Sequence, residues 1–195
     1  MRCQVIGSLG CSEELMGLVS CINQVPNAYP SENQINLVRM RLENLSQIIV
    51  IKDEDRSSGC STNVDEPRIR ATADFYHIAA LIYFHQRVQR LSSKHPVMKT
   101  LVKSALDLIS QMEVCTSPWP LFVVACEVTG DSERLQILQT FAGMEEHRRI
   151  GNIAVTRMIV ETVWKHHDLA SDDLARGKID WRSIVDLKVL SPSFI

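Results

Sequence analysis

The chain has 195 residues, of which 45% are hydrophobic, and it carries a formal net charge of −2 with a sequence pI near 6.3. This length and composition are typical of one globular domain with its own core, and they exclude a disordered chain. The slightly acidic balance argues against an extended phosphate-binding surface, because nucleic-acid-binding domains usually carry a basic patch.

No segment predicts membrane insertion or secretion. The longest wholly apolar run is Ile78–Phe84, far short of the roughly 20 residues that a transmembrane helix needs. The N-terminus lacks the apolar centre of a signal peptide. We therefore expect an intracellular, cytoplasmic protein.

The cysteines do not follow the spacing of a metal site or of a secreted disulfide framework. No two lie at C-x-x-C spacing, and no cysteine pair faces a histidine pair at zinc-finger spacing. We expect reduced thiols, no structural metal and no cofactor. The six cysteines are Cys3, Cys11, Cys21, Cys60, Cys115 and Cys126.

The first predicted helix begins after Ser12, which can cap it, and Glu13 and Glu14 suit its first turn because the helix dipole favours negative charge there. Its apolar stripe consists of Leu15, Leu18, Val19 and Ile22.

A second helix is predicted from the capping box that Ser31 and Gln34 form. Apolar residues then recur at spacings of three and four as far as Ile49, which predicts one continuous amphipathic helix. These residues are Ile35, Val38, Leu42, Leu45 and Ile49.

The polar stretch Lys52–Glu66 is predicted to be a mobile surface loop within a single domain, 1–195. Pro67 suits the start of a long helix, Arg68–Leu91, whose middle is apolar on most faces and therefore central. Pro96 starts the next helix. The residues expected to point inward from it are Val97, Leu101, Ala105, Leu108 and Met112.

The stretch Ser117–Glu127, SPWPLFVVACE, predicts a buried helix with an irregular start. Pro118 and Pro120 fit a first helical turn, where a missing N–H costs little. The remaining charge, on Glu127, should reach water or pair with Arg134.

Two further helices and a short closing one complete the prediction. Gly130 is expected to end one helix, with Asp131 or Ser132 capping the next; Gly151 ends that one, and Asn152 caps another. Their apolar faces comprise Leu135, Leu138 and Phe141, then Val155, Ile159, Val163 and Trp164. A short helix is expected around Trp181–Leu187.

The sum is an all-α fold of about seven or eight helices in antiparallel hairpins, because no alternating strand pattern competes. Gly7–Gly10 is neither a P-loop nor a dinucleotide fingerprint, and no strand is predicted before it.

Three constellations could carry chemistry, and each has a plainer interpretation that we favour. Cys126 beside Glu127 could be a nucleophile, but the pattern is more typical of a buried apolar helix. His166-His167-Asp168 places adjacent side chains about 100° apart, which suits a surface helix end better than a metal. Glu145-Glu146-His147 is not an H-E-x-x-H motif.

His77 and His85 lie eight residues apart, near one face of the long helix. They could line a pocket, although ordinary, partly buried histidines are the plainer interpretation.

An ordered series of segments resembles the fungal-specific transcription factor domain, the helical regulatory region of fungal zinc-cluster transcription factors. The resemblance spans roughly Ser8 to Leu187 and includes an early helix from Gly10 to Leu18. The segments are Ile78–Leu91, Ser117–Glu127, Asp131–Phe141, Gly151-Asn152, Val163–Asp168 and Asp180-Trp181.

The resemblance implies a nuclear, non-enzymatic protein that regulates transcription by RNA polymerase II, by sensing a small molecule, restraining activation or contacting other proteins. Such factors usually begin with six closely spaced cysteines that hold two zinc ions, and this chain lacks that spacing. We therefore expect no direct DNA binding by this chain. It would be the C-terminal part of a regulator, a truncated product or a separately encoded regulatory domain.

The resemblance also implies packing roles for Pro118, Trp119, Pro120, Leu121, Cys126, Asn152 and Trp164. Tyr83 and His85 are the predicted wall of an effector pocket. Two alternatives stay open: a helical enzyme that uses a buried Cys/Glu/His site, and a module that only dimerises or scaffolds.

Overall fold

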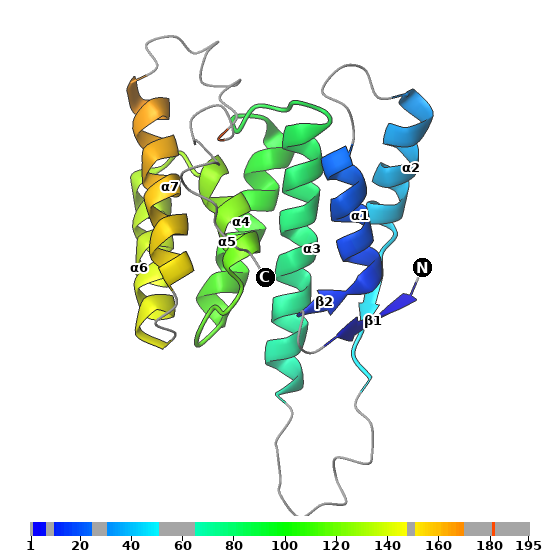
Figure 1. The fold of residues 1–195 in the computed structure, drawn as a ribbon, viewed down its shortest axis with the longest axis horizontal. Coiled ribbons are helices and arrows are strands. Elements are labelled where there is room, and N and C mark those ends of the chain that lie inside the picture. The colour runs from blue at the N-terminus through cyan, green and yellow to red at the C-terminus, as the bar shows by residue number, and fades with distance from the viewer. Residues whose placement is uncertain are drawn as a thin grey trace, which may run out of the picture.

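The computed structural model describes residues 2–6, 10–24, 31–50, 65–147, 151–169 and 181. Within these residues the chain forms seven α-helices and one small three-stranded sheet, which confirms the predicted all-α class. The helices are α1 (Glu13–Gln24), α2 (Glu32–Glu43), α3 (Glu66–Arg87), α4 (Pro96–Gln111), α5 (Pro118–Glu127), α6 (Asp131–His147) and α7 (Gly151–Leu169). They stand roughly side by side, with α3 in the middle, α1 and α2 on one side, and α6 and α7 on the other (Figure 1).

The helix predicted after Ser12 is confirmed as α1. The backbone N–H of Leu15 donates to Ser12 Oγ at 3.4 Å, so the expected cap forms. Burial follows the predicted stripe, because Leu15, Leu18, Val19 and Ile22 are the buried residues of α1.

The prediction that no strand precedes Gly7–Gly10 is wrong. Strand β1 (Arg2–Ile6) lies between β2 (Cys11–Ser12), to which it is antiparallel, and β3 (Ser46–Ile48), to which it is parallel. The two parallel strands lie more than forty residues apart in sequence, so no local pattern could show this pairing. Residues 7–9 lie outside the described part of the chain.

The same sheet corrects the second predicted helix. Ser31 caps α2 as expected, with Gln34 N donating to Ser31 Oγ, but the helix ends at Glu43 rather than near Ile49. Leu45 is buried in the connection to β3. The helical spacing of apolar residues continues past Glu43, but pairing with β1 overrides it.

One glutamine fastens the sheet to two helices. Ser12 N donates to Gln47 Oε1 at 2.8 Å, and Gln47 Nε2 donates to the Ala73 carbonyl at 2.7 Å. Gln47 thus joins β3 to the start of α1 and to the middle of α3. Ser12 and Ala73 are buried, so few other partners could replace these bonds.

The long central helix is confirmed with shifted ends, since α3 covers Glu66–Arg87. Asp65 accepts a hydrogen bond from Arg68 N at 3.2 Å and caps the helix. Residues 52–64 of the predicted loop 52–66 lie outside the described part of the chain. Its last residue, Glu66, is already the first residue of α3. The buried residues of α3 are Ala73, Phe75, Ala79, Ala80, Ile82, Tyr83 and Phe84.

Two of the predicted apolar faces are rotated in the structure. On α4 the buried residues are Met98, Val102, Ala105, Leu106 and Ile109, whereas the predicted Val97 is 41% exposed. On α6 the predicted Phe141 is buried, but the predicted Leu135 is 56% exposed, and Ile137 and Met144 are buried as well. Both helices have apolar residues on neighbouring faces, so sequence spacing alone does not select the face that the core covers.

Three predicted boundaries also differ from the structure. α5 ends at Glu127, and Gly130 instead caps α6, because its carbonyl accepts from Arg134 N at 2.9 Å and its N–H donates to Glu133 Oε2 at 3.2 Å. α7 begins at Gly151, one residue before the expected cap, Asn152. The predicted helix around 181–187 lies outside the described residues except Trp181, which packs edge-on against Phe122 at 4.9 Å between ring centroids.

Candidate functional site

The helix that carries the SPWPLFVVACE sequence is buried along most of its length. Every residue from Pro120 to Glu127 is buried. α5 packs against α3, α4 and α7, which explains why its sequence has no polar face. The predicted buried helix is confirmed, and its two prolines lie in the first turn.

Cys126 and Glu127 lie inside this core rather than in an open cleft. Their side chains are 4% and 7% exposed. Ser93 Oγ donates to Glu127 Oε2 at 2.6 Å, so the loop before α4 satisfies part of the buried carboxylate. The geometry therefore gives the thiol a packing environment, as the plainer interpretation predicted.

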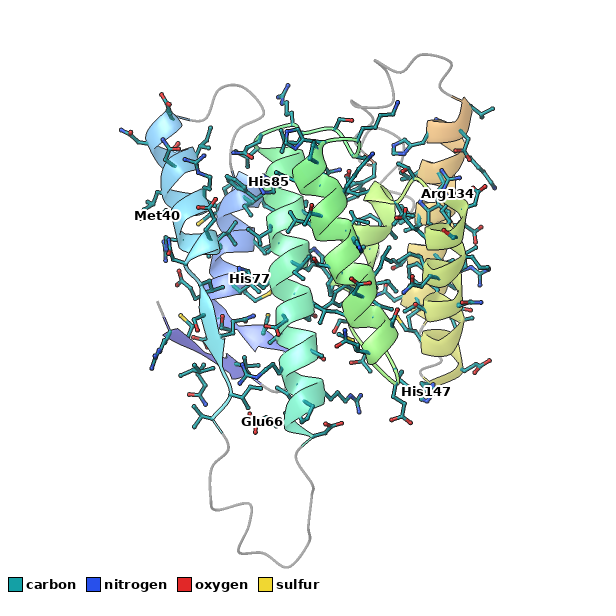
Figure 2. All side chains as sticks on the ribbon, turned by 180° about the vertical axis from the view of Figure 1, so that it is seen from behind. Met40, Glu66, His77, His85, Arg134 and His147 are labelled. Atoms are coloured by element: carbon teal, nitrogen blue, oxygen red, sulfur yellow. The ribbon has the colours of Figure 1, made fainter. Side chains whose placement is uncertain are left out.

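Arg134 is used elsewhere than predicted. It forms two hydrogen bonds of 2.8 Å with the carboxylate of Asp168, and this bidentate pair, more than any other interaction, raises the pKa of the guanidinium. The guanidinium also lies 5.3 Å from the ring centroid of Trp164. Arg134 (labelled in Figure 2) thus ties α6 to the end of α7.

Trp164 connects α7 to the buried helix. Its indole Nε1 donates to the Ala125 carbonyl at 2.8 Å, and both residues are buried. The same carbonyl also accepts from Val128 N at 3.3 Å, so the indole adds a second hydrogen bond at the C-terminal end of α5.

The two predicted pocket-wall residues face different neighbours. Tyr83 donates its hydroxyl to Asn23 Oδ1 on α1 at 2.5 Å, and its ring lies edge-on to Trp119 with 6.0 Å between centroids. His85 Nδ1 lies 2.5 Å from Gln89 Oε1, just after the end of α3. Positions two apart on a helix point about 200° from each other, which accounts for the divergence.

His77, the other histidine of this helix, holds the end of α2. Its Nε2 lies 2.8 Å from the Leu42 carbonyl, which can only accept, so this nitrogen carries the proton. Figure 2 labels His77 and His85 along α3, and each has a local structural partner.

Sequence reasoning missed a cavity at the sheet end of the molecule. It has a volume of about 540 Å³ and is lined by Cys3, Gln4, Ile6, Glu13 and Glu14. Arg41 of α2 forms an ion pair with Glu14 and so borders this region. The first-turn residues of α1, Glu13 and Glu14, could be predicted from the sequence. The cavity also needs β1, which could not.

In the described part of the chain, no three histidine, cysteine or acidic side chains are placed to share a metal ion. Among the same residues, no helix combines the length and the apolar character that crossing a bilayer requires.

The comparisons with known proteins agree with the resemblance inferred from the sequence. The family described as the fungal specific transcription factor domain matches residues 4–195. The chain belongs to this family, a class of transcription regulatory domains, and no zinc-cluster module is evident within it.

One relative with a similar sequence is named as a transcription factor. The chain is similar to "Transcription factor iacI" of Pestalotiopsis fici, with 20% identity over 120 residues. The aligned stretch covers 62% of this chain but only 31% of that protein. No solved structure matches the chain.

Proposed function

We propose that this chain is the non-enzymatic, effector-responsive part of a fungal regulator of RNA polymerase II transcription, and that it acts in the nucleus without a DNA-binding module of its own. The observation that carries this proposal is the family match over residues 4–195. The printed name of the relative, a transcription factor, supports the same role.

Charge supports the part of the proposal that concerns DNA. The chain carries 21 basic and 23 acidic residues, so it supplies no net positive charge for the phosphate backbone. Contact with a promoter would come through a separate DNA-binding partner or segment. The chain's contribution would then be to regulate that partner's output.

The contact between α1 and α3 is where we propose that an effector acts. Tyr83 and Asn23 are joined by one hydrogen bond, and Trp119 brings the start of α5 against the same tyrosine. A ligand that competes for the Tyr83 hydroxyl would shift α1 relative to α3 and α5. His85, near the end of the same helix, would sense changes there through Gln89.

The test is a fusion of this chain to a heterologous DNA-binding domain in a fungal reporter strain grown on a panel of media. We expect reporter output to differ from that of the DNA-binding domain alone and to vary with the medium. Tyr83→Phe should blunt the variation, whereas Tyr76→Phe, which stands one heptad earlier and stacks on the same Trp119, should preserve it. Equal output from the fusion and from the bare DNA-binding domain on every medium would contradict the proposal.

A gel shift with the unfused chain tests the expected lack of DNA binding. We expect no sequence-specific complex at physiological salt, with or without added zinc. A zinc-dependent, sequence-specific complex would show that these residues contain a DNA-binding site.

A further inference from the structure

The loop between α3 and α4 places a serine in a distinctive charge pattern. This loop, Val88–His95, has the sequence VQRLSSKH and lies at the end of the molecule opposite the sheet (Figure 1). Ser93 has Arg90 three residues before it and Lys94 directly after it. No other serine or threonine in the 195-residue sequence has an arginine three positions before it. Basophilic serine/threonine kinases recognise an arginine there, because carboxylates line that part of their substrate groove.

The loop can present this serine to an enzyme. None of its residues belongs to a helix or a strand, and Arg90, Lys94 and His95 are exposed. Arg90 has φ +53°, a conformation that costs a residue with a side chain free energy. Drawing the loop out into the extended form that a kinase groove holds relieves this strain.

The Ser93 hydroxyl itself points into the core. It donates to Glu127 Oε2 at 2.6 Å, and Glu127, the last residue of α5, is only 7% exposed. A buried carboxylate is costly unless hydrogen-bond donors face it. Ser93 therefore helps to hold the charged end of α5 inside the molecule.

A phosphate on Ser93 would reverse this contact. It removes the O–H donor and places a charge of about −1.5 to −2 beside the Glu127 carboxylate. Two anions this close in a site shielded from water repel each other strongly. A phosphate turned outward instead meets Lys94 and the first turn of α4, which begins at Pro96, and both favour negative charge.

A change at Glu127 would also reach α7. The Ala125 carbonyl, two residues before Glu127, accepts the hydrogen bond from Trp164 Nε1 at 2.8 Å. α5 packs against α3, α4 and α7. Releasing its last turn would therefore weaken the contacts that join α7 to the centre of the fold.

We propose that Ser93 is a phosphorylation site for a basophilic serine/threonine kinase, and that its phosphorylation breaks the contact with Glu127 and loosens the last turn of α5. The kinase transfers the γ-phosphoryl group of ATP to Ser93 Oγ, the bond from that phosphorus to the β-phosphate oxygen breaks, ADP leaves, and the hydroxyl proton passes to the kinase's catalytic base. The inference adds a covalent input to the regulatory role proposed above and does not depend on it.

The site is tested on the folded full chain with magnesium, ATP and, in turn, the catalytic domains of cAMP-dependent protein kinase and protein kinase C. We expect mass spectrometry to locate phosphate on Ser93, and Ser93→Ala to abolish it. Arg90→Ala should lower the initial rate by at least about tenfold, because it removes the charge that the kinase recognises. Arg39→Ala, at an exposed arginine of α2, is the matched control and should leave the rate unchanged.

Two outcomes of this experiment would overturn the proposal. One is that neither kinase places phosphate on Ser93. The other is that phosphate reaches Ser93 only after urea has unfolded the chain, since the folded loop would then not be the substrate.

Hydrogen exchange on the phosphorylated chain tests the structural consequence. Amides of residues 124–128 should exchange at least about tenfold faster than in the unmodified chain, because the last turn of α5 loses a buried contact and gains a repulsive one. Amides of α2, whose main contacts are with α1 and α3, should not change. Ser93→Ala removes the hydrogen bond without adding charge, so it should speed exchange at residues 124–128 by less than about threefold.

Glu127→Gln separates charge repulsion from the loss of the hydrogen bond. Its amide can accept from the Ser93 hydroxyl and can donate to a phosphate, so phosphorylation of this variant should speed exchange at residues 124–128 by less than about threefold. The comparison with Ser93→Ala changes no core residue and decides the question if Glu127→Gln does not fold. Phosphorylation that leaves exchange at these residues unchanged, or speeds it equally with Glu127 and with Gln at this position, would contradict the proposed release.

Discussion

Helices α5 and α2 are similar in length, ten and twelve residues, yet opposite in how the fold holds them. Eight of the ten residues of α5 are buried, whereas only Leu42 is buried in α2. α5 is held by the hydrophobic core on nearly all sides. α2 has a narrower apolar contact, in which the buried Leu42 and the partly buried Ile35 and Val38 meet the core, so polar contacts matter more to it.

Polar contacts near its ends hold α2 in place. Ser31 caps its first turn, His77 binds the Leu42 carbonyl near its last residue, and Arg41 pairs with Glu14. Such contacts are individually worth about 1 kcal/mol or less at exposed positions. The difference between the helices thus predicts a stable centre around α3 and α5 and a more easily detached edge at α2 and the sheet.

The largest expected effect comes from truncating a side chain in α5. Phe122 is 1% exposed, so Phe122→Ala should lower the free energy of unfolding by about 3–5 kcal/mol. The matched change in α2 is Leu37→Ala, at a half-exposed position, and should cost no more than about 0.5 kcal/mol. Urea unfolding followed by circular dichroism measures both. Similar losses from the two variants would remove the contrast between the helices.

The second effect concerns the glutamine that fastens the sheet. Gln47→Leu leaves Ser12 N and the Ala73 carbonyl without their side-chain partner, which should cost about 2–4 kcal/mol. Hydrogen exchange should speed up most at the amides of residues 11–15. Gln139→Leu, at an exposed position on α6, is the control and should change neither quantity. Wild-type exchange at residues 11–15 in the Gln47 variant would show that the sheet is held by other contacts.

Local patterns were sufficient to predict α1 and α5, because their signals lie within the helices themselves. Ser12 and the stripe that follows it specify where α1 begins and which face it buries. The strands could not be predicted in this way. Arg2 pairs with Ser46, and short strands gain their stability from such distant partners rather than from their own sequence.

The family region was predictable for the same reason that α5 was, since its residues form contiguous segments. The expected span, Ser8 to Leu187, falls within the matched residues 4–195. The partner of Arg134 was not predictable: Glu127 is nearer in sequence, but Asp168 is the residue that α7 brings to it. That Tyr83 and His85 form the wall of an effector pocket stays a prediction.

A third effect, of about 1 kcal/mol, concerns pH. Burial raises the pKa of the Cys115 thiol from 9.0 to about 11, so the folded state holds this proton more tightly than the unfolded state. The resulting stability is fully present below pH 9 and is lost as the pH rises towards 11. Between pH 8 and pH 10 the native chain should lose about 1 kcal/mol more than Cys115→Ala does, measured by urea unfolding at each pH.

The exposed Cys21 provides the control for this pH dependence. Cys21→Ala should follow the native chain across the same range, because removing an exposed thiol leaves the buried one in place. A Cys115→Ala variant with an unchanged slope would show that another group governs the alkaline loss of stability.

The smallest effect concerns the turn after α3, which belongs to the stable centre but contains one strained position. Arg90 has φ +53°, a left-handed conformation that costs a non-glycine residue free energy. Arg90→Gly removes the side chain and relieves the backbone strain, whereas Arg90→Ala removes the side chain but leaves the strain. The difference in the free energy of unfolding between the two variants therefore isolates the backbone contribution. The glycine variant should be about 0.5–1 kcal/mol more stable than the alanine variant in urea unfolding. Equal stabilities of the two variants would show that the backbone of this turn can relax its strain. The turn would then resemble the weakly held region of α2 and the sheet rather than the stable centre.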